Sequence, residues 1–68
     1  MCFMRLKVNG ELIECSAGTV AALLEELGVS APAVAVEVNL AIVKKKDFGT
    51  FALKEDDQVE IVNFVGGG

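Results

Sequence analysis

Apolar and polar residues alternate in two short runs near the N-terminus, as they do in strands with one buried face. The runs cover residues 4–8 and 11–15, and the dipeptide Asn9-Gly10 separates them. Asn-Gly is typical of a type I′ turn, because both turn residues must adopt a positive φ. The turn also fixes the register, in which the inward pairs are Met4 with Cys15, Leu6 with Ile13, and Val8 with Glu11. We therefore expect a β-hairpin at the start of the fold.

The spacing of apolar residues then changes to the period of a helix. Positions i, i+3, i+4 and i+7 are occupied by Val20, Leu23, Leu24 and Leu27, which indicates an amphipathic helix of two to three turns. Thr19 is a suitable N-cap, and Gly28 fits the position after the last turn, where a positive φ ends a helix. Because so short a helix is unstable alone, it must pack against a sheet.

Three later segments have the pattern of strands. They are residues 34–38, the short segment 42–43, and residues 58–62. In the last of them Val59 and Ile61 are expected to face inward. A hairpin, a helix, a strand, a short strand and a final strand follow one another in the order of the β-grasp fold. The sequence thus predicts an α+β protein with a mixed four- to five-stranded sheet and one helix packed across one face.

Size and composition restrict the function. The chain has 68 residues, of which 53% are hydrophobic and 24% charged, so we expect one folded domain over residues 1–68. A net charge of −4 disfavours nucleic acid and anionic membranes as partners. Histidine is absent, which removes the usual general base. The sequence shows no signal peptide or membrane span, and a reducing cytoplasm is the expected location.

Three consecutive glycines, Gly66, Gly67 and Gly68, directly follow the last predicted strand and end the sequence. Glycine adds no packing and has the largest ordering entropy, so they bring nothing to the fold. A flexible tail at 64–68 could instead thread a narrow channel in a partner and present the carboxylate of Gly68. That carboxylate needs activation, most simply as an acyl-adenylate, before a sulfur nucleophile can displace AMP. The alternative interpretation is a frayed end or a cloning remnant.

The ordered set of segments resembles the ThiS family, the sulfur carriers of thiamin thiazole biosynthesis. The stretches that carry the resemblance are Val8-Asn9-Gly10-Glu11, 19–28, 34–39, 53–62 and the closing Val65-Gly66-Gly67-Gly68. They cover essentially the whole chain in the order of the family. The resemblance implies a ubiquitin-like β-grasp fold. It also implies that Gly68 carries the sulfur as a thiocarboxylate and that Gly67 is the penultimate glycine of the family's Gly-Gly end.

The resemblance further implies three protein partners. A ThiF-type enzyme would adenylate Gly68, a sulfur-donor enzyme would supply the sulfur, and a ThiG-type thiazole synthase would accept it. ATP and magnesium would belong to the activating partner, so no cofactor or metal is expected in this chain. One departure lies at Asn39-Leu40, where the family has an Asn-Gly turn. This turn is therefore expected to be longer or strained.

A docking surface is predicted beside the tail. Leu12, Val62 and Phe64 should lie on the sheet face opposite the helix, and Val65 is assigned to the same surface. Clustered apolar residues on an open face suggest a partner-binding patch, although single exposed apolar residues are ordinary.

Other reactive or charged residues have simpler interpretations. Cys15 is expected to be a buried structural thiol on the core face. Nothing near Cys2 would lower its pKa, which disfavours a persulfide-carrying role. The acidic run Glu55, Asp56 and Asp57 is interpreted as a solvated turn rather than a metal site.

Two further functions compete with the thiazole sulfur carrier. A MoaD-like carrier, or a carrier for tRNA thiolation or protein modification, would use the same tail chemistry. A non-covalent β-grasp binding module would have an inert tail, and deletion of Gly68 distinguishes it from any carrier. An independent catalyst is the weakest possibility, because the sequence contains no nucleophile–base pair.

Overall fold

A computed structural model describes residues 3–63 of the chain. It contains one five-stranded sheet with the strand order β2-β1-β5-β3-β4. The elements are β1 (Met4–Val8), β2 (Glu11–Cys15), α1 (Val20–Leu27), η1 (Ala31–Ala33), β3 (Val34–Val38), β4 (Ala41–Val43), η2 (Lys45–Asp47) and β5 (Gln58–Asn63). β1 and β5 are parallel and the other neighbours are antiparallel. The predicted mixed sheet with one helix is confirmed.

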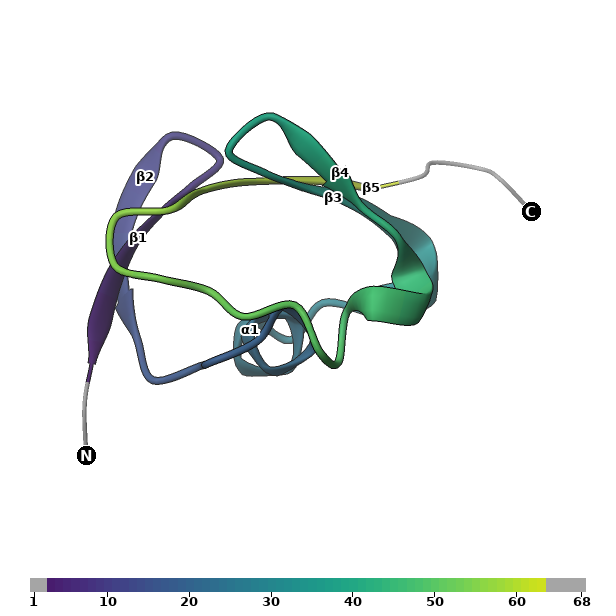
Figure 1. Cartoon of the computed structure of the whole chain (residues 1–68), viewed down its shortest axis with the longest axis horizontal. Coiled ribbons are helices and arrows are strands. Elements are labelled where there is room, and N and C mark those ends of the chain that lie inside the picture. The colour runs from purple at the N-terminus through teal and green to yellow at the C-terminus, as the bar shows by residue number, and fades with distance from the viewer. Residues whose placement is uncertain (1–2, 64–68) are drawn as a thin grey trace.

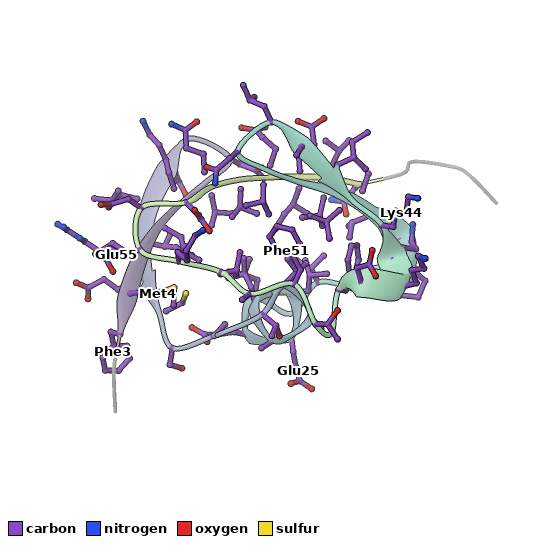
Figure 2. All side chains as sticks on the ribbon, viewed as in Figure 1. Phe3, Met4, Glu25, Lys44, Phe51 and Glu55 are labelled. Carbon is purple, nitrogen blue, oxygen red and sulfur yellow. The ribbon has the colours of Figure 1, made fainter. Side chains whose placement is uncertain are left out.

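One face of the sheet is covered and the other is open. The helix α1 lies across one face, and the connection from η2 to β5 runs along that same side (Figure 1). The side chains between these layers form the core, and those that are almost fully buried are Leu6, Cys15, Val20, Leu23, Leu24, Val34, Val36 and Val59. Phe48 is also buried, and Phe51 packs against the core between helix and sheet (Figure 2). The prediction of a buried Cys15 is confirmed.

The first hairpin has the predicted register. Met4 lies opposite Cys15, Leu6 opposite Ile13 and Val8 opposite Glu11. Asn9 and Gly10 form the turn with φ values of 50° and 83°. Both residues therefore occupy the left-handed region that a type I′ turn requires. The register leaves Leu6 and Val8 on the core face and turns Arg5 and Lys7 outward.

The helix is fixed at both ends as the sequence predicts. The Thr19 hydroxyl accepts a hydrogen bond from the backbone N–H of Ala22 at 3.2 Å. Gly28 ends the helix with φ 73°, and its N–H donates to the carbonyl of Glu25 at 3.1 Å. Two further N-terminal N–H groups of the helix donate across to the connection before β5, which the sequence did not predict: Val20 to the Phe51 carbonyl at 3.2 Å and Ala21 to the Phe48 carbonyl at 2.8 Å. The helix start is thereby tied to the chain that leads into β5.

The turn between β3 and β4 is strained and not lengthened. Val38 pairs with Ala41, so that only Asn39 and Leu40 connect the strands. Their φ values are 53° and 73°, the same left-handed pair as in the first hairpin. A leucine in this region has an unfavourable contact between its Cβ and the backbone that glycine lacks. Of the two expected outcomes, a longer turn or strain, the structure shows strain.

The interpretation of Asp57 as part of a solvated turn is wrong. Its side chain is buried, whereas Glu55 and Asp56 are exposed as expected. The Asp57 carboxylate accepts hydrogen bonds from the Asn39 side-chain amide at 2.9 Å and from the Lys54 backbone N–H at 2.8 Å. These two donors compensate the carboxylate for its lost hydration. Asp57 therefore joins the turn before β5 to the β3–β4 hairpin.

Candidate functional site

The strand that leads into the terminal glycines is held along its length from both sides. On the β1 side, the side chain of Asn9 acts like one more peptide group of the parallel ladder. Its Oδ1 accepts from the Ile61 N–H at 2.7 Å and its Nδ2 donates to the Ile61 carbonyl at 3.3 Å. The backbone N–H of Asn9 donates to the Val59 carbonyl at 2.8 Å. The turn residue Asn9 thus continues the hydrogen bonding of β1 beyond the end of that strand.

On the β3 side, Asn39 fixes the start of β5. Its backbone N–H donates to the Gln58 carbonyl at 2.7 Å, and its Oδ1 accepts from the Gln58 N–H at 3.0 Å. The β3–β5 ladder then extends to the pair Val34 with Asn63. The last described part of the chain is therefore anchored within the sheet up to Asn63.

The predicted reactive residues follow this anchored strand. Phe64, Val65, Gly66, Gly67 and Gly68 lie outside the described residues. Their predicted roles in docking, threading and carrying sulfur therefore remain predictions. The structure shows that β5, the strand that precedes these residues, is the central strand of the sheet. A partner that binds the folded domain would therefore also fix the position of Asn63, where β5 ends.

Two of the predicted docking residues lie within the described part. Leu12 and Val62 are 66% and 57% exposed and both point away from the core. They are not neighbours, however. Leu12 on β2 lies opposite Lys7, which pairs with Gln58, and Val62 lies four positions further along β5. Leu12 and Val62 are therefore separated by about 13 Å along the strands and about 10 Å across the sheet. Their docking role stays a prediction, but they do not form one contiguous patch.

The sequence reasoning missed the most exposed apolar residues of the sheet region. Ile42 on β4 is 76% exposed, and Leu40 in the preceding turn is 84% exposed. Because Ile42 lies opposite Glu37 and its neighbour Val43 is buried, Ile42 faces outward. Strand alternation could have identified it, since only one of two adjacent residues of a strand can face the core. The run Ile42-Val43 looks uniformly apolar, which hid this difference.

One ion pair lies at the opposite end of the sheet. The Arg5 Nε lies 3.2 Å from Oε2 of Glu55, and the Arg5 backbone N–H donates to Oε1 of the same carboxylate at 3.1 Å. These hydrogen bonds hold the pKa of Glu55 below its ordinary value, and the bond from the Arg5 backbone has the larger effect. Both side chains are about half exposed, so the pair is screened by solvent and serves to hold the turn before β5 against β1.

The described residues hold neither a candidate metal site nor a candidate membrane-spanning helix. Within residues 3–63, no group of three or more His, Cys, Asp or Glu side chains is arranged to hold a metal ion. In the same part of the chain, no helix is both long and apolar enough to span a membrane.

Fold and sequence together define the class of this protein. A five-stranded mixed sheet, one helix across one face and a glycine end after the central strand are the features of a ubiquitin-like β-grasp protein. The chain belongs to the ThiS family, whose family model matches residues 6–68.

Solved structures agree with this assignment. The chain is similar to the crystal structure of a thiamine biosynthesis protein (ThiS) from Geobacter metallireducens, with a TM-score of 0.82 and 35% identity over 96% of this chain and 100% of that one. It is also similar to an NMR solution structure of a thiamine biosynthesis protein from the same organism, with a TM-score of 0.77, again at 35% identity, over 96% of this chain and 88% of that one. The predicted ubiquitin-like fold and family resemblance are confirmed.

Curated relatives add a second kind of similarity. The chain is 52% identical over 66 residues to a thiazole synthase of Paramagnetospirillum magneticum and 46% identical over 66 residues to one of Magnetococcus marinus. It spans 96% of its own length but 20% of the length of these relatives. It is also 31% identical over 64 residues to an uncharacterized protein, ycf40, of Porphyra purpurea, covering 93% of this chain and 90% of that protein.

Proposed function

We propose that this chain is the sulfur carrier of thiazole formation in thiamin biosynthesis. The observation that carries the proposal is the extent of the family match, which runs to Gly68 and so includes all three terminal glycines. The ThiS structure of Geobacter metallireducens bears the name of a thiamine biosynthesis protein. The strand before the tail, β5, is anchored at the centre of the sheet. This arrangement suits a protein that binds a partner through its folded domain and reacts at its C-terminal residue.

The chemistry takes place at the carboxylate of Gly68 and uses groups that partners supply. The carboxylate attacks the α-phosphorus of ATP, pyrophosphate leaves, and an acyl-adenylate forms. A sulfur nucleophile at the oxidation level of sulfide then attacks the acyl carbon and AMP leaves with the bonding electrons. The product is a thiocarboxylate. ATP and magnesium belong to the adenylating enzyme, so this chain acts as a protein co-substrate and not as a catalyst.

Three partners follow from this chemistry. A ThiF-type enzyme activates Gly68, a sulfur-donor enzyme delivers the sulfur, and a ThiG-type thiazole synthase receives it in the cytoplasm. The last of these is supported by the two relatives called thiazole synthase, in which a segment similar to this chain forms part of a longer protein. Linking a carrier and its acceptor in one polypeptide raises their effective concentration for each other. Such a linkage is useful when the two proteins act in consecutive steps.

Docking is proposed to involve the exposed Leu12 and Val62 together with Phe64 and Val65, while Gly66 and Gly67 thread the partner's channel. Substitution of Leu12 by Asp or of Phe64 by Ala tests this. Each should slow adenylation without unfolding the domain. An unchanged adenylation rate in a folded variant would remove that residue from the surface.

Reconstitution tests the proposal as a whole. The purified chain is incubated with a ThiF-type enzyme, MgATP and a sulfide source, and the mass of its C-terminal peptide is measured. Exchange of one oxygen for sulfur at Gly68 should add about 16 Da. A variant lacking Gly68 is the control and should stay unmodified and fail to support thiazole formation. If the shortened chain works as well as the full one, the β-grasp domain acts as a non-covalent binding module and the carrier proposal fails.

A further inference from the structure

The turn of the first hairpin contains a reactive pair of residues. Asn9 and Gly10 are both exposed to solvent, and both lie at positive φ. When glycine follows asparagine, its backbone nitrogen can attack the amide carbon of the asparagine side chain, because glycine has no side chain to shield that nitrogen. A Cβ at Gly10 would meet no atom within 4 Å, so no other part of the fold crowds this residue. The turn therefore offers both the residue pair and the solvent access that the reaction needs.

The amide of Asn9 also has a structural task. In the parallel pair of β1 and β5, Val8 is the last residue of β1 and lies beside Val59. Ile61, two residues further along β5, therefore lies past the end of β1. Its N–H donates to Oδ1 of Asn9 at 2.7 Å, and its carbonyl accepts from Nδ2 of Asn9 at 3.3 Å. Because the N–H and C=O of one strand residue point to the same side, Ile61 turns both groups toward Asn9.

We propose that Asn9 is a site of spontaneous deamidation and that the reaction releases the hold of the first hairpin on β5. In the first step the Gly10 nitrogen bonds to Cγ of Asn9, and the proton of the Gly10 N–H passes through solvent to the departing amide group. That group, which contains Nδ2, leaves as ammonia. Water then opens the resulting succinimide ring at either carbonyl and gives aspartate or isoaspartate. The inference goes beyond the proposed carrier function and does not depend on it.

The contacts of Asn9 determine when the reaction takes place. The atom that leaves, Nδ2, is the donor to the Ile61 carbonyl, and Oδ1 is bonded to the Ile61 N–H. While both bonds persist, the amide is held against β5 and is not free to rotate toward the Gly10 nitrogen. The reaction therefore proceeds from states in which the turn has opened locally from β5. We expect the folded chain to react more slowly than the unfolded chain.

Neither product can restore both bonds. Aspartate replaces the donor Nδ2 by a carboxylate oxygen, so that an acceptor faces the Ile61 carbonyl, which is also an acceptor. Isoaspartate lengthens the backbone within a two-residue turn and no longer fits the type I′ geometry. In both cases Ile61 loses bonding on the side of the first hairpin. The affected strand is β5, which leads toward the C-terminal glycines.

The second hairpin provides a comparison within the same chain. Asn39 has nearly the same φ as Asn9, 53° against 50°, but it is followed by Leu40. The leucine side chain shields the backbone nitrogen that would have to attack Cγ of Asn39, whereas glycine leaves it open. We therefore expect Asn39 to keep its amide under conditions in which Asn9 loses it.

Ageing of the purified chain tests the site. The wild-type chain is incubated at mildly alkaline pH, folded in buffer and unfolded in urea, and is then digested with trypsin. Residues 8–44 are released as one peptide that contains both asparagines, since no lysine or arginine lies between Lys7 and Lys44. Tandem mass spectrometry locates the gain of about 1 Da that accompanies each deamidation. Asn9 should gain this mass and Asn39 should not, and Asn9 should react about tenfold faster in urea than in buffer.

Reciprocal variants separate the residue pair from the fold. In urea, where folding plays no part, Gly10→Leu should slow deamidation of Asn9 about tenfold, and Leu40→Gly should accelerate deamidation of Asn39 by about the same factor. Unchanged rates in both variants would exclude attack by the following backbone nitrogen. Absence of the mass gain at Asn9 in buffer and in urea would overturn the inference as a whole.

Amide hydrogen exchange measures the release of β5. The Ile61 amide should exchange about tenfold faster in the aged chain than in fresh wild type, and likewise in Asn9→Asp, which contains one of the two products from the start. The Leu53 amide, which donates to the Gly18 carbonyl at 2.9 Å, is the control and should keep its exchange rate. Equal exchange of Ile61 in the aged and fresh chains would refute the release of β5, and equal deamidation of Asn9 in buffer and in urea would refute its protection by Ile61.

Discussion

The two hairpins of the sheet use the same turn geometry with different residues. In each, an asparagine at a φ of about 50° is followed by a residue at a larger positive φ, Gly10 in the first hairpin and Leu40 in the second. In each, the asparagine side chain turns back onto β5. The first hairpin thus uses the residue pair best suited to its turn, whereas the second accepts a leucine that the geometry disfavours.

This difference separates what the fold needs from what it tolerates. Both asparagines hold β5, so both turns need an amide side chain and a left-handed backbone there. Gly10 satisfies the second position without strain, and a Cβ at this residue would meet no atom within 4 Å. Leu40 is almost fully exposed, so burial of its side chain contributes little free energy to offset the backbone strain. The contacts of the described residues do not explain why a leucine stands at this position.

The largest effects are expected from the asparagines. Asn39→Ala removes the acceptor for Gln58 and one of the two donors to the buried Asp57 carboxylate, and it places alanine at positive φ. It should lower the free energy of unfolding by about 3 kcal/mol. Asn9→Ala breaks two bonds to Ile61 in an exposed setting and should cost about 2 kcal/mol.

Urea unfolding followed by circular dichroism measures both losses. Asn63→Ala is the control, because this exposed asparagine lies in extended β5 and its side chain makes no hydrogen bond in the described structure. Equal stabilities of Asn39→Ala and the control would refute the role of Asn39 in anchoring β5.

A smaller effect should follow from exchanging the residues that differ between the turns. Gly10→Leu imposes the strain of the second hairpin on the first and should destabilise the domain by about 1 kcal/mol. The space around Gly10 is open, so the loss reports backbone conformation alone. Gly18→Leu is the matched control, since a Cβ there also meets nothing and no positive φ is involved. The same loss for both variants would show that turn strain is not its source.

The smallest effect concerns pH. The pKa of Glu55 is lower in the folded chain than its ordinary value of 4.5, chiefly because the Arg5 backbone N–H and then its side chain bond the carboxylate. This contribution is complete above the unfolded pKa and disappears as pH falls through the lower folded pKa. Glu55→Gln should therefore show a slightly shallower loss of stability than wild type below pH 4.5, measured by thermal unfolding across an acid pH series. Parallel pH profiles would rule out the pairing as a source of acid sensitivity.

The sequence predicted those features of the fold that local patterns specify. Asn9-Gly10 fixed the first hairpin, and Thr19 and Gly28 marked the ends of the helix, because turn and cap residues act over a few positions. It could not predict the bond between Asn39 and Asp57, which lie far apart in the chain and meet only in the folded sheet. For the same reason Asp57 looked like part of a solvated acidic run.

The candidate site was predictable to a smaller extent. The three glycines and the family resemblance predict the tail chemistry, which stays a prediction because the tail lies outside the described residues. The docking surface depends on which strands are neighbours, and the strand order β2-β1-β5-β3-β4 separates Leu12 from Val62 and brings Ile42 and Glu37 close to β5. Alternation within one strand predicts on which face of the sheet a residue lies. It does not predict which residues of the neighbouring strands lie beside it.

The carrier role is tested most directly by the intact mass of the chain purified from its native host during thiamin-limited growth. The account predicts a population of chains that is heavier than the sequence mass by about 16 Da, with the added mass confined to Gly68. A chain that carries only its unmodified carboxylate under these conditions, and that remains unmodified in cells lacking the thiazole synthase, would contradict the account.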